Sequence, residues 1–312
     1  MAKKMKTSIG GQAPIEGIMM QGPDKRAIVV RAPEGLVTKV EPYKPLKEKC
    51  KLLGWPIIRG CAALFTSLYH GVKALTYSAD FFIEEEGEPE KQSKFEQWLE
   101  KKLSGDKFAK AVTYLGVCLG IVLGVLLFFM LPTFIAGFVG KNISSSILKN
   151  LIEGLIRIVI FLGYMFMCSK MSDIKRVFSY HGAEHKTIFC YEAGEELTVE
   201  NVRKYSCHHP RCGTSFLFVV MIISILVFAV VSWSNVFIRM ALRIVLLPVV
   251  VGISYEINCF VGRHENLFTK ILTAPGLALQ NLTTFEPDDE MIEVGIEALK
   301  LVIPEQEGAD KW

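Results

Sequence analysis

The sequence predicts a mainly α-helical membrane protein: a membrane helical bundle of about four transmembrane helices with a small N-terminal β-hairpin and cytoplasmic helical segments. Hydrophobic residues make up 51% of the 312 residues, yet 21% are charged. Residues 111–140 contain no charged side chain, and a membrane-spanning helix needs about 20 mostly apolar residues. Apolar stretches of this length between charged segments indicate repeated crossing of a bilayer. The net charge of +3 is too small to indicate nucleic acid as a partner.

Two β-branched runs near the N-terminus predict the hairpin. Residues 27–31 and 36–40 flank a turn that contains Gly35, a pattern typical of paired strands. The Gly-rich residues 8–24 show no clear period and are expected to form a loop or a short strand. These parts together make up an N-terminal segment over residues 1–53.

The next segment, residues 54–106, combines a helix and a linker. Apolar side chains recur at helical spacing over residues 54–82 and predict an amphipathic helix. This helix is expected either to lie on the bilayer surface or to pack in the bundle, and the pattern favours neither. A charged linker or surface helix is expected over residues 84–106.

Four apolar stretches predict two transmembrane pairs, one in residues 107–172 and one in residues 213–261. The expected spans cover residues 111–140, 147–168, 213–238 and 241–261. Pro132 is expected to kink the first span. Four crossings place both termini and residues 173–212 on the same side. The distribution of Lys and Arg makes that side the cytoplasm of a protein in the cell membrane.

The C-terminal segment, residues 262–312, is expected to form cytoplasmic helices. Pro275 stands between Ala274 and Gly276 and is expected to break one helix. Residues 286–290 are expected to open the next helix, with a proline in its first turn and acidic side chains that match the helix dipole.

The strongest functional signal lies in residues 173–212. His181, Glu184 and His185 fall in a helix predicted over residues 179–193. Two imidazoles one helical turn apart can bind one metal ion, and the neighbouring carboxylate can accept a proton from water. The spacing matches the inverted zincin pattern. The alternative is a surface helix with two solvated histidines.

A tetrahedral zinc site needs at least one further protein ligand. Residues 207–213 form a turn that can fold back onto the helix. His209 and Cys212 are the favoured ligands from this turn, and Cys207 and His208 are held in reserve. Four protein ligands would make a structural zinc site, whereas three would leave a position for water, and the sequence leaves both open.

Four other residues are weaker candidates. Glu256 lies within the fourth predicted span, where it could bind metal or, as the favoured alternative, neutralise an arginine. Glu16 stands in a Gly-rich stretch that could approach a ligand closely. Lys186 and Arg211 are cationic and close to the motif in sequence, so they could stabilise an oxyanion or a phosphate.

The chain resembles the bacterial DUF1385 family, also called the YqhQ-like family. The resemblance extends over most of the chain and rests on eight strings, at residues 10–20, 55–60, 180–187, 196–201, 209–216, 252–256, 274–277 and 286–289. The resemblance implies a multi-pass membrane protein that is a metal-dependent enzyme. It also favours His209 and Cys212 over Cys207 and His208, which lie outside these strings.

The leading hypothesis is a hydrolase with a cytoplasm-facing site and an unspecified substrate. Glu184 would be the general base, and zinc or another divalent metal would be held by residues drawn from His181, His185, His209, Cys212 and Glu256. One rival is a non-enzymatic membrane scaffold or assembly factor with a structural zinc site. A second rival is a transporter component, with Glu153, Arg157 and Glu256 lining a path through the bilayer. The expected partners are the lipid bilayer and the substrate, and the sequence does not specify an oligomeric state.

Overall fold

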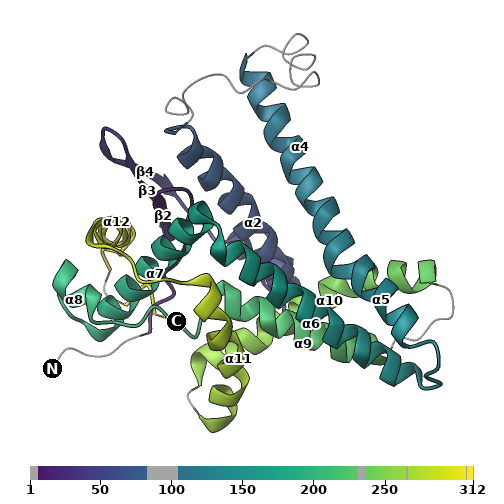
Figure 1. The fold of residues 1–312 in the computed structure, drawn as a ribbon. Helices are drawn as coiled ribbons and strands as arrows, with labels where there is room; N and C mark the ends of the chain where they lie inside the picture. The colour runs from purple at the N-terminus through teal and green to yellow at the C-terminus, as the bar shows by residue number, and fades with distance from the viewer. Residues whose placement is uncertain (1–5, 83–104, 231–235, 265, 307, 312) are drawn as a thin grey trace.

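The computed structural model describes residues 6–82, 105–230, 236–264, 266–306 and 308–311. The protein is mainly helical, with one small sheet near the N-terminus (Figure 1). The two ends of the described chain lie together, because Thr7 pairs with Lys311 and the Ser8 amide donates to the carbonyl of Asp310 at 2.5 Å. The predicted charged linker falls almost wholly on residues 83–104, which lie outside the described part.

The N-terminal segment forms a four-stranded antiparallel sheet rather than a single hairpin. Its strands lie in chain order: β1 (Gly10–Gln12), β2 (Gly17–Gln21), β3 (Lys25–Ala32) and β4 (Gly35–Pro42). The predicted hairpin is confirmed as β3 and β4. Residues 8–24, predicted as a loop or a short strand, form the two strands β1 and β2. Four of the five residues of β2 are buried. A strand covered on both faces lacks the polar–apolar alternation that marks a strand in sequence.

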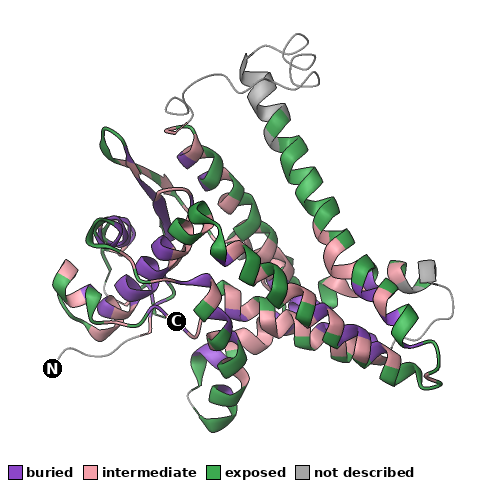
Figure 2. Cartoon of the chain, viewed as in Figure 1, coloured by how far each residue is buried: buried purple, intermediate pink, exposed green. Residues whose placement is uncertain are grey.

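Helices cover both faces of this sheet and make the main core, which Figure 2 shows as buried segments at the strands, α7 and α12. One face packs against α7 (Ser172–Ala193) and α12 (Asp289–Lys300) through Ile18, Met20, Ala27 and Val29. The other face packs against α2 (Ile58–Ala79) through Met19, Ile28, Val30 and Ala74. The helix predicted over residues 54–82 is therefore confirmed, and its C-terminal half lies on the sheet. The short helices α1 (Leu46–Lys49) and η1 (Lys51–Gly54) precede it.

The apolar helices α6 (Ser146–Lys170), α9 (Gly213–Val230) and α10 (Val236–Arg263) form a bundle beside the sheet layer (Figure 1). Gly154 of α6 lets Ile225 of α9 approach closely, since a Cβ there would lie 2.5 Å from the Ile225 side chain. An exposed helix, α4 (Gly105–Val125), leads through a π-helical turn (Leu126–Met130) into α5 (Leu131–Val139), which packs on α6.

Within the described residues, three helices are long and apolar enough to cross a membrane: Tyr114–Val139, Ser146–Lys170 and Met240–Arg263. The third predicted span, residues 213–238, is shorter in the structure, because the apolar part of α9 covers Gly213–Ala229. Residues 231–235 lie outside the described part, and residues 236–238 belong to α10 rather than to the third predicted span. The four-span prediction is therefore supported for three helices.

The three prolines singled out in the sequence lie inside helices or just before one. Pro132 follows the π-helical turn, and the helix continues through it. Pro275 lies inside α11 (Leu267–Thr283) and does not end it, because residues beyond it pack against α9; a Cβ on Gly276 would lie 2.8 Å from Ser215. Pro287 precedes α12 rather than lying in its first turn.

Acidic residues cap and begin α12. Asp288 is the N-cap residue, and its carboxylate accepts the Met291 amide at 2.9 Å. Asp289 and Glu290 lie in the first turn, as predicted, where negative charge favours the helix dipole.

Candidate metal centre

Helix α7 carries the histidine motif in its middle and not at its start. The helix begins at Ser172, seven residues before the predicted start, and ends at Gly194, whose φ of +72° closes it as predicted. Residues 182–188 are buried between the sheet, α12 and the segment that leads into α12. Gly182 permits this packing, because a Cβ there would lie 2.1 Å from the carbonyl oxygen of Phe285.

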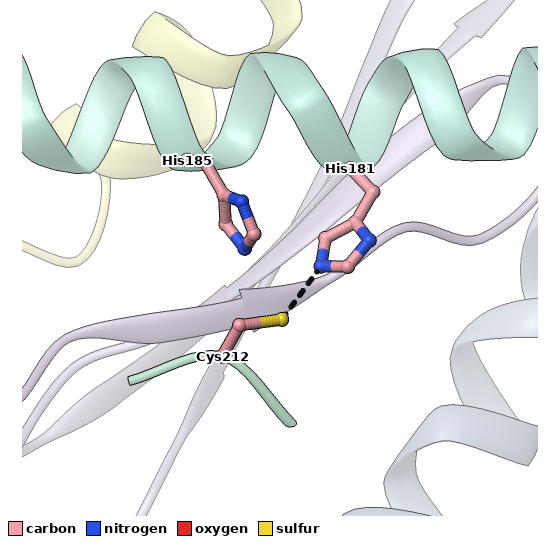
Figure 3. Close-up of side chains that lie close together, drawn as sticks. All are labelled: His181, His185 and Cys212. Atoms are coloured by element: carbon pink, nitrogen blue, oxygen red, sulfur yellow. Dashed lines mark hydrogen bonds between the residues drawn. The ribbon is translucent and has the colours of Figure 1, made fainter. Parts of the chain in front are cut away.

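Three potential ligands converge on one point. Among the described residues, His181, His185 and Cys212 offer ligand atoms that all lie within 4.8 Å of one another. Figure 3 shows the two imidazoles projecting from α7 towards the Cys212 side chain, which comes from the turn before α9. The Nε2 atom of His181 lies 3.1 Å from the Cys212 sulfur. Two imidazoles and a thiolate are a typical zinc donor set.

Backbone carbonyls determine which imidazole nitrogens are available. The Nδ1 atom of His181 lies 2.9 Å from the carbonyl oxygen of Thr283, and Nδ1 of His185 is hydrogen-bonded to the carbonyl oxygen of Cys207. A carbonyl can only accept, so both Nδ1 atoms must carry the proton. In the neutral imidazoles, the lone pairs are therefore on the Nε2 atoms. This is the arrangement by which outer partners orient histidine ligands.

The charge state of Cys212 also suits a metal. Burial raises the pKa of its thiol, but His181 and His185 outweigh burial and hold that pKa well below its usual value. Burial lowers the pKa of His181, but the charge of Cys212 and its hydrogen bond outweigh this and raise the pKa to about 9. The metal-free site therefore holds an imidazolium beside a thiolate, and the thiolate is the form that binds metals.

Glu184 lies between the two histidines in sequence, and only one of its two carboxylate oxygens has a hydrogen-bond partner among the described residues. One carboxylate oxygen accepts the Gly11 amide of β1 at 2.9 Å. The other, Oε2, is buried and has no hydrogen-bond partner among the described residues. Burial raises the pKa of Glu184, although His181 and His185 oppose that shift. A buried carboxylate with a raised pKa and a free oxygen is suited to accept a proton.

Gly11 is a site residue whose specific role the sequence analysis missed. A Cβ at this position would lie 2.5 Å from the carbonyl oxygen of Met19 and 3.1 Å from the Glu184 carboxyl carbon. Glycine therefore lets β1 pass directly over the catalytic candidate and donate to it. The run of Gly10 and Gly11 was the available signal, but the sequence analysis connected it to Glu16 instead.

His209 lies next to the cluster but is not part of the three-ligand group. Its ring centre lies 5.5 Å from that of His185. Its Nδ1 accepts the Arg211 amide at 3.4 Å, and its Nε2 lies 3.3 Å from the Arg211 guanidinium and 3.9 Å from Glu192. The ring nitrogens thus face the ion pair of Arg211 and Glu192.

The backbone of His209 has a clearer role than its ring. Gln280 of α11 is fully buried, accepts the His209 amide at 2.7 Å and donates to the His209 carbonyl at 2.8 Å. It also donates to Ser215 at 2.9 Å. Gln280 therefore anchors both ends of the turn that carries Cys212, a role that no motif in the sequence revealed.

The two predicted cations do not belong to the ligand cluster. Lys186 donates to the carbonyl oxygens of Arg203 and Tyr205, at 3.0 and 2.7 Å, and lies 2.8 Å from the carboxylate of Glu286. Arg211 pairs with Glu192 and donates to the carbonyl oxygen of Thr7 at 2.9 Å. Lys186 and Arg211 therefore hold separate segments of the chain together around the cluster.

The remaining candidates are used in ion pairs or supporting bonds. Glu256 is paired with Arg59 of α2, which was the favoured alternative for it. Glu16 pairs with Arg176 and accepts from Tyr180 at 3.1 Å. Cys207 contributes its carbonyl to His185. His208 is not in the three-ligand group.

Comparisons with known proteins identify the family. The model of a family described as "Protein of unknown function (DUF1385)" matches residues 55–305. The chain is also 35% identical over 297 residues to "Uncharacterized protein YqhQ" of Bacillus subtilis (strain 168), a match that covers 95% of this chain and 92% of that protein. No solved structure matches the chain. The long family match and this relative together show that the chain belongs to the DUF1385 family.

Proposed function

We propose that the protein is a zinc-dependent hydrolase of the cell membrane whose site faces the cytoplasm. The observation that carries the proposal is the convergence of two imidazole Nε2 atoms and a thiolate beside a buried carboxylate oxygen that lacks a partner. His181, His185 and Cys212 would hold the metal. Glu184 would be the general base.

The ligand number favours catalysis over a purely structural site. Structural zinc sites are closed by four protein ligands, whereas catalytic sites keep a position for water or substrate. The structure brings three ligands together within 4.8 Å, and Glu184 adds a proton acceptor next to them. The scaffold hypothesis would instead need a fourth ligand, for which His209 would have to leave Glu192 and Arg211.

A zinc ion at this site would lower the pKa of a water molecule and polarise the bond to be cleaved. The residues of the chain supply the rest. Glu184 takes a proton at Oε2 and passes it to the leaving group, while the Gly11 amide keeps the other oxygen in place. The carbonyls of Thr283 and Cys207 keep both imidazoles turned towards the metal position. In the net reaction, water adds across the cleaved bond, with its OH on one product and its H on the other.

The cytoplasmic placement rests on the topology of charges. The sheet, α7 and α12 form one polar layer, and both described ends of the chain lie in it (Figure 1). The positive-inside rule assigns this layer to the cytoplasm, and the lipid bilayer is then the immediate partner of α6, α9 and α10.

Metal content and base substitution test the proposal together. Mass spectrometry on the full chain in detergent should find about one zinc per chain. This zinc should be lost in the double variant His181→Ala/His185→Ala and kept in the matched control His208→Ala. Glu184→Gln should keep zinc and the melting temperature but lose roughly 10²- to 10⁴-fold in hydrolytic rate against a panel of esters and phosphoesters.

Three results would count against the hydrolase. A folded wild-type protein that takes up no zinc would remove the metal site. Loss of zinc in Glu184→Gln would make Glu184 a ligand. Unfolding of α7 and the following turn on chelation, with no rate that depends on Glu184, would favour the structural-zinc scaffold.

A further inference from the structure

A cavity of about 550 Å³ lies between the sheet, the first half of α2 and the start of α9. Ligand-binding cavities typically measure roughly 300–1,000 Å³. Its polar lining includes Gln21, Tyr43, Arg59 and His70. Among the described lining residues there is no aspartate or glutamate. The wall thus offers hydrogen-bonding groups and one cation, Arg59, which pairs with Glu256 of α10, and no described acidic side chain lines it.

A buried cation stands directly behind this wall. Arg26 of β3 is only 4% exposed, and its Nε atom has no hydrogen-bond partner among the described residues. Glu41 is the carboxylate that acts on Arg26, but it is held by Lys39 and Lys73 at 3.3 and 2.8 Å. A buried guanidinium without its own counter-ion is costly. An anion in the cavity would relieve that cost.

Arg26 also sets the hydrogen-bonding character of the wall. Its guanidinium lies 2.5 Å from both Nδ1 of His70 and Oε1 of Gln21. Arginine can only donate, so His70 and Gln21 must both accept at these atoms. Burial, together with Arg26 and Lys73, lowers the pKa of His70 and keeps the ring neutral. The Nε2–H of His70 and the amide NH₂ of Gln21 then remain as donors on two side chains that line the cavity.

The cavity borders the metal centre through residues that have no side chain. Gly11 lines the cavity, and its amide binds Glu184. Gly213 also lines it and directly follows Cys212. A Cβ on Gly213 would meet no atom within 4 Å. The cavity wall thus includes one residue that is bonded to the candidate base and one that directly follows a candidate metal ligand.

Helix α2 separates the cavity from an apolar outer surface. Thr66, Ser67 and His70 line the cavity. On the same helix Phe65 and Tyr69 are 72% and 67% exposed.

The helix that carries this apolar surface packs against a candidate membrane span, α10. A Cβ on Gly60 of α2 would lie 2.6 Å from Tyr255 of α10, and Arg59 of α2 pairs with Glu256 of α10. An apolar face joined to a membrane-crossing helix suits the surface of a bilayer. The cavity thus lies on the inner side of a helix whose outer face suits the level of lipid headgroups.

We propose that this cavity binds the phosphate-bearing headgroup of a membrane lipid, with Arg26, Gln21 and His70 as the recognition group. The proposal deepens the proposed function, on which it rests in one respect: such lipids are then the substrate class of the metal site. The lipid-binding part stands on the cavity and Arg26 alone.

Lipid titration of the full chain in detergent micelles tests the proposal. Calorimetry compares dihexanoyl phosphatidic acid with dihexanoylglycerol, which lacks the phosphate, and with glycerol 3-phosphate, which lacks the chains. The phospholipid should bind at least tenfold more tightly than either. Zinc content is measured on every sample, and conversion of the bound lipid is followed in wild type and Glu184→Gln.

Two variants and one control locate the site. Gln21→Glu gives Arg26 the counter-ion that it lacks, so this variant should fold at least as stably as wild type and bind the phospholipid at least tenfold more weakly. Arg26→Gln should weaken binding by roughly 10- to 100-fold, because it removes the positive charge behind the wall and the donors that fix the orientation of His70 and Gln21. Arg31→Gln removes the same charge from the same strand, where it pairs with Glu293, and should leave binding unchanged.

The outcomes separate this proposal from the hydrolase. Equal binding of dihexanoylglycerol would overturn phosphate recognition, and equal binding of glycerol 3-phosphate would overturn a membrane lipid as the source. Unchanged affinity in both Gln21→Glu and Arg26→Gln would overturn the site. Zinc without lipid binding refutes this proposal alone, and lipid binding without zinc refutes the hydrolase alone. Lipid that binds to the zinc-loaded protein and is never converted refutes the substrate class.

Discussion

Glu153 in the bundle of apolar helices and Glu184 in the polar layer are both buried helix carboxylates, only 2% and 5% exposed, yet their surroundings differ. Both oxygens of Glu153 are used: Oε1 accepts from Thr133 at 2.6 Å and from Arg157 and Arg243, and Oε2 accepts from Arg243 at 3.0 Å. Glu184 has one oxygen bound and one without a partner. A carboxylate paired on every side holds helices together, whereas a half-paired one has a free oxygen for chemistry.

The same contrast bears on the transporter hypothesis. Glu153, Arg157 and Glu256 were its expected path-lining residues. Arg157 and Arg243 both pair with Glu153, and Arg59 pairs with Glu256. Ion pairs between neighbouring helices are a sufficient structural reason for charges at these positions.

Removal of the Glu153 charge should have the largest effect on stability. Glu153→Gln leaves Arg157 and Arg243 buried without their shared counter-ion, and we expect a loss of about 3–5 kcal/mol in the free energy of unfolding. Denaturant unfolding in mixed micelles measures this, with exposed Glu34→Gln as a control that should stay within about 0.5 kcal/mol. Glu184→Gln should not lose stability, because it relieves a buried, half-paired charge. Similar losses of unfolding free energy in both variants would contradict the distinction between a structural and a functional carboxylate.

Gly182→Ala should come next, because it forces a methyl group against backbone. The new Cβ would lie 2.1 Å from the Phe285 carbonyl oxygen, so α7 must shift, at a cost of about 1–3 kcal/mol. Zinc affinity should fall with it, since His181 and His185 move on the same helix. Gly163→Ala on α6 meets nothing within 4 Å and should be neutral or slightly stabilising. Unchanged zinc affinity in Gly182→Ala would show that the cluster tolerates displacement of α7.

Gln280→Ala tests whether the turn before α9 depends on its buried anchor. The His209 amide would lose its partner, and the His209 carbonyl would keep only the Cys212 amide, which should cost about 1–3 kcal/mol of stability. Zinc affinity should fall about tenfold, because Cys212 is carried by the same turn. The exposed neighbour Asn281→Ala is the control. A stability loss without a change in zinc affinity would mean that Cys212 is held by other contacts.

Zinc affinity should rise with pH by about tenfold per unit between pH 7 and 9 and level off above. In the metal-free protein His181 has a pKa of about 9, so below that pH it carries a proton that zinc must displace. Cys212, whose pKa is lowered, has none to lose. Calorimetry at pH 7.5 in buffers of different ionisation enthalpy should count about one proton released. No release would mean that the imidazolium–thiolate pair does not form.

Local patterns were sufficient for much of this molecule. The hairpin of β3 and β4, the amphipathic α2, the long apolar helices and the Gly194 helix end follow from periodicity and from glycine conformation. His181, Glu184 and His185 share a helix, so spacing alone predicts that they lie together. Contacts within one turn of helix or one hairpin depend on neighbours in sequence, and such neighbours are visible before the fold is known.

What the sequence by itself determined is therefore the mainly helical architecture with long apolar helices, the family and one half of the proposed metal site. Only the tertiary structure decided that Cys212 approaches the two histidines while His209 faces Glu192, that Gly11 holds Glu184, and that Gln280 anchors the turn. It also decided that Arg26 lies behind a cavity with no ion pair of its own among the described residues. Each of these depends on the approach of segments far apart in the chain. The reason is that burial removes water as a partner, so each buried polar group must find its match wherever packing brings one, and no local pattern records that match.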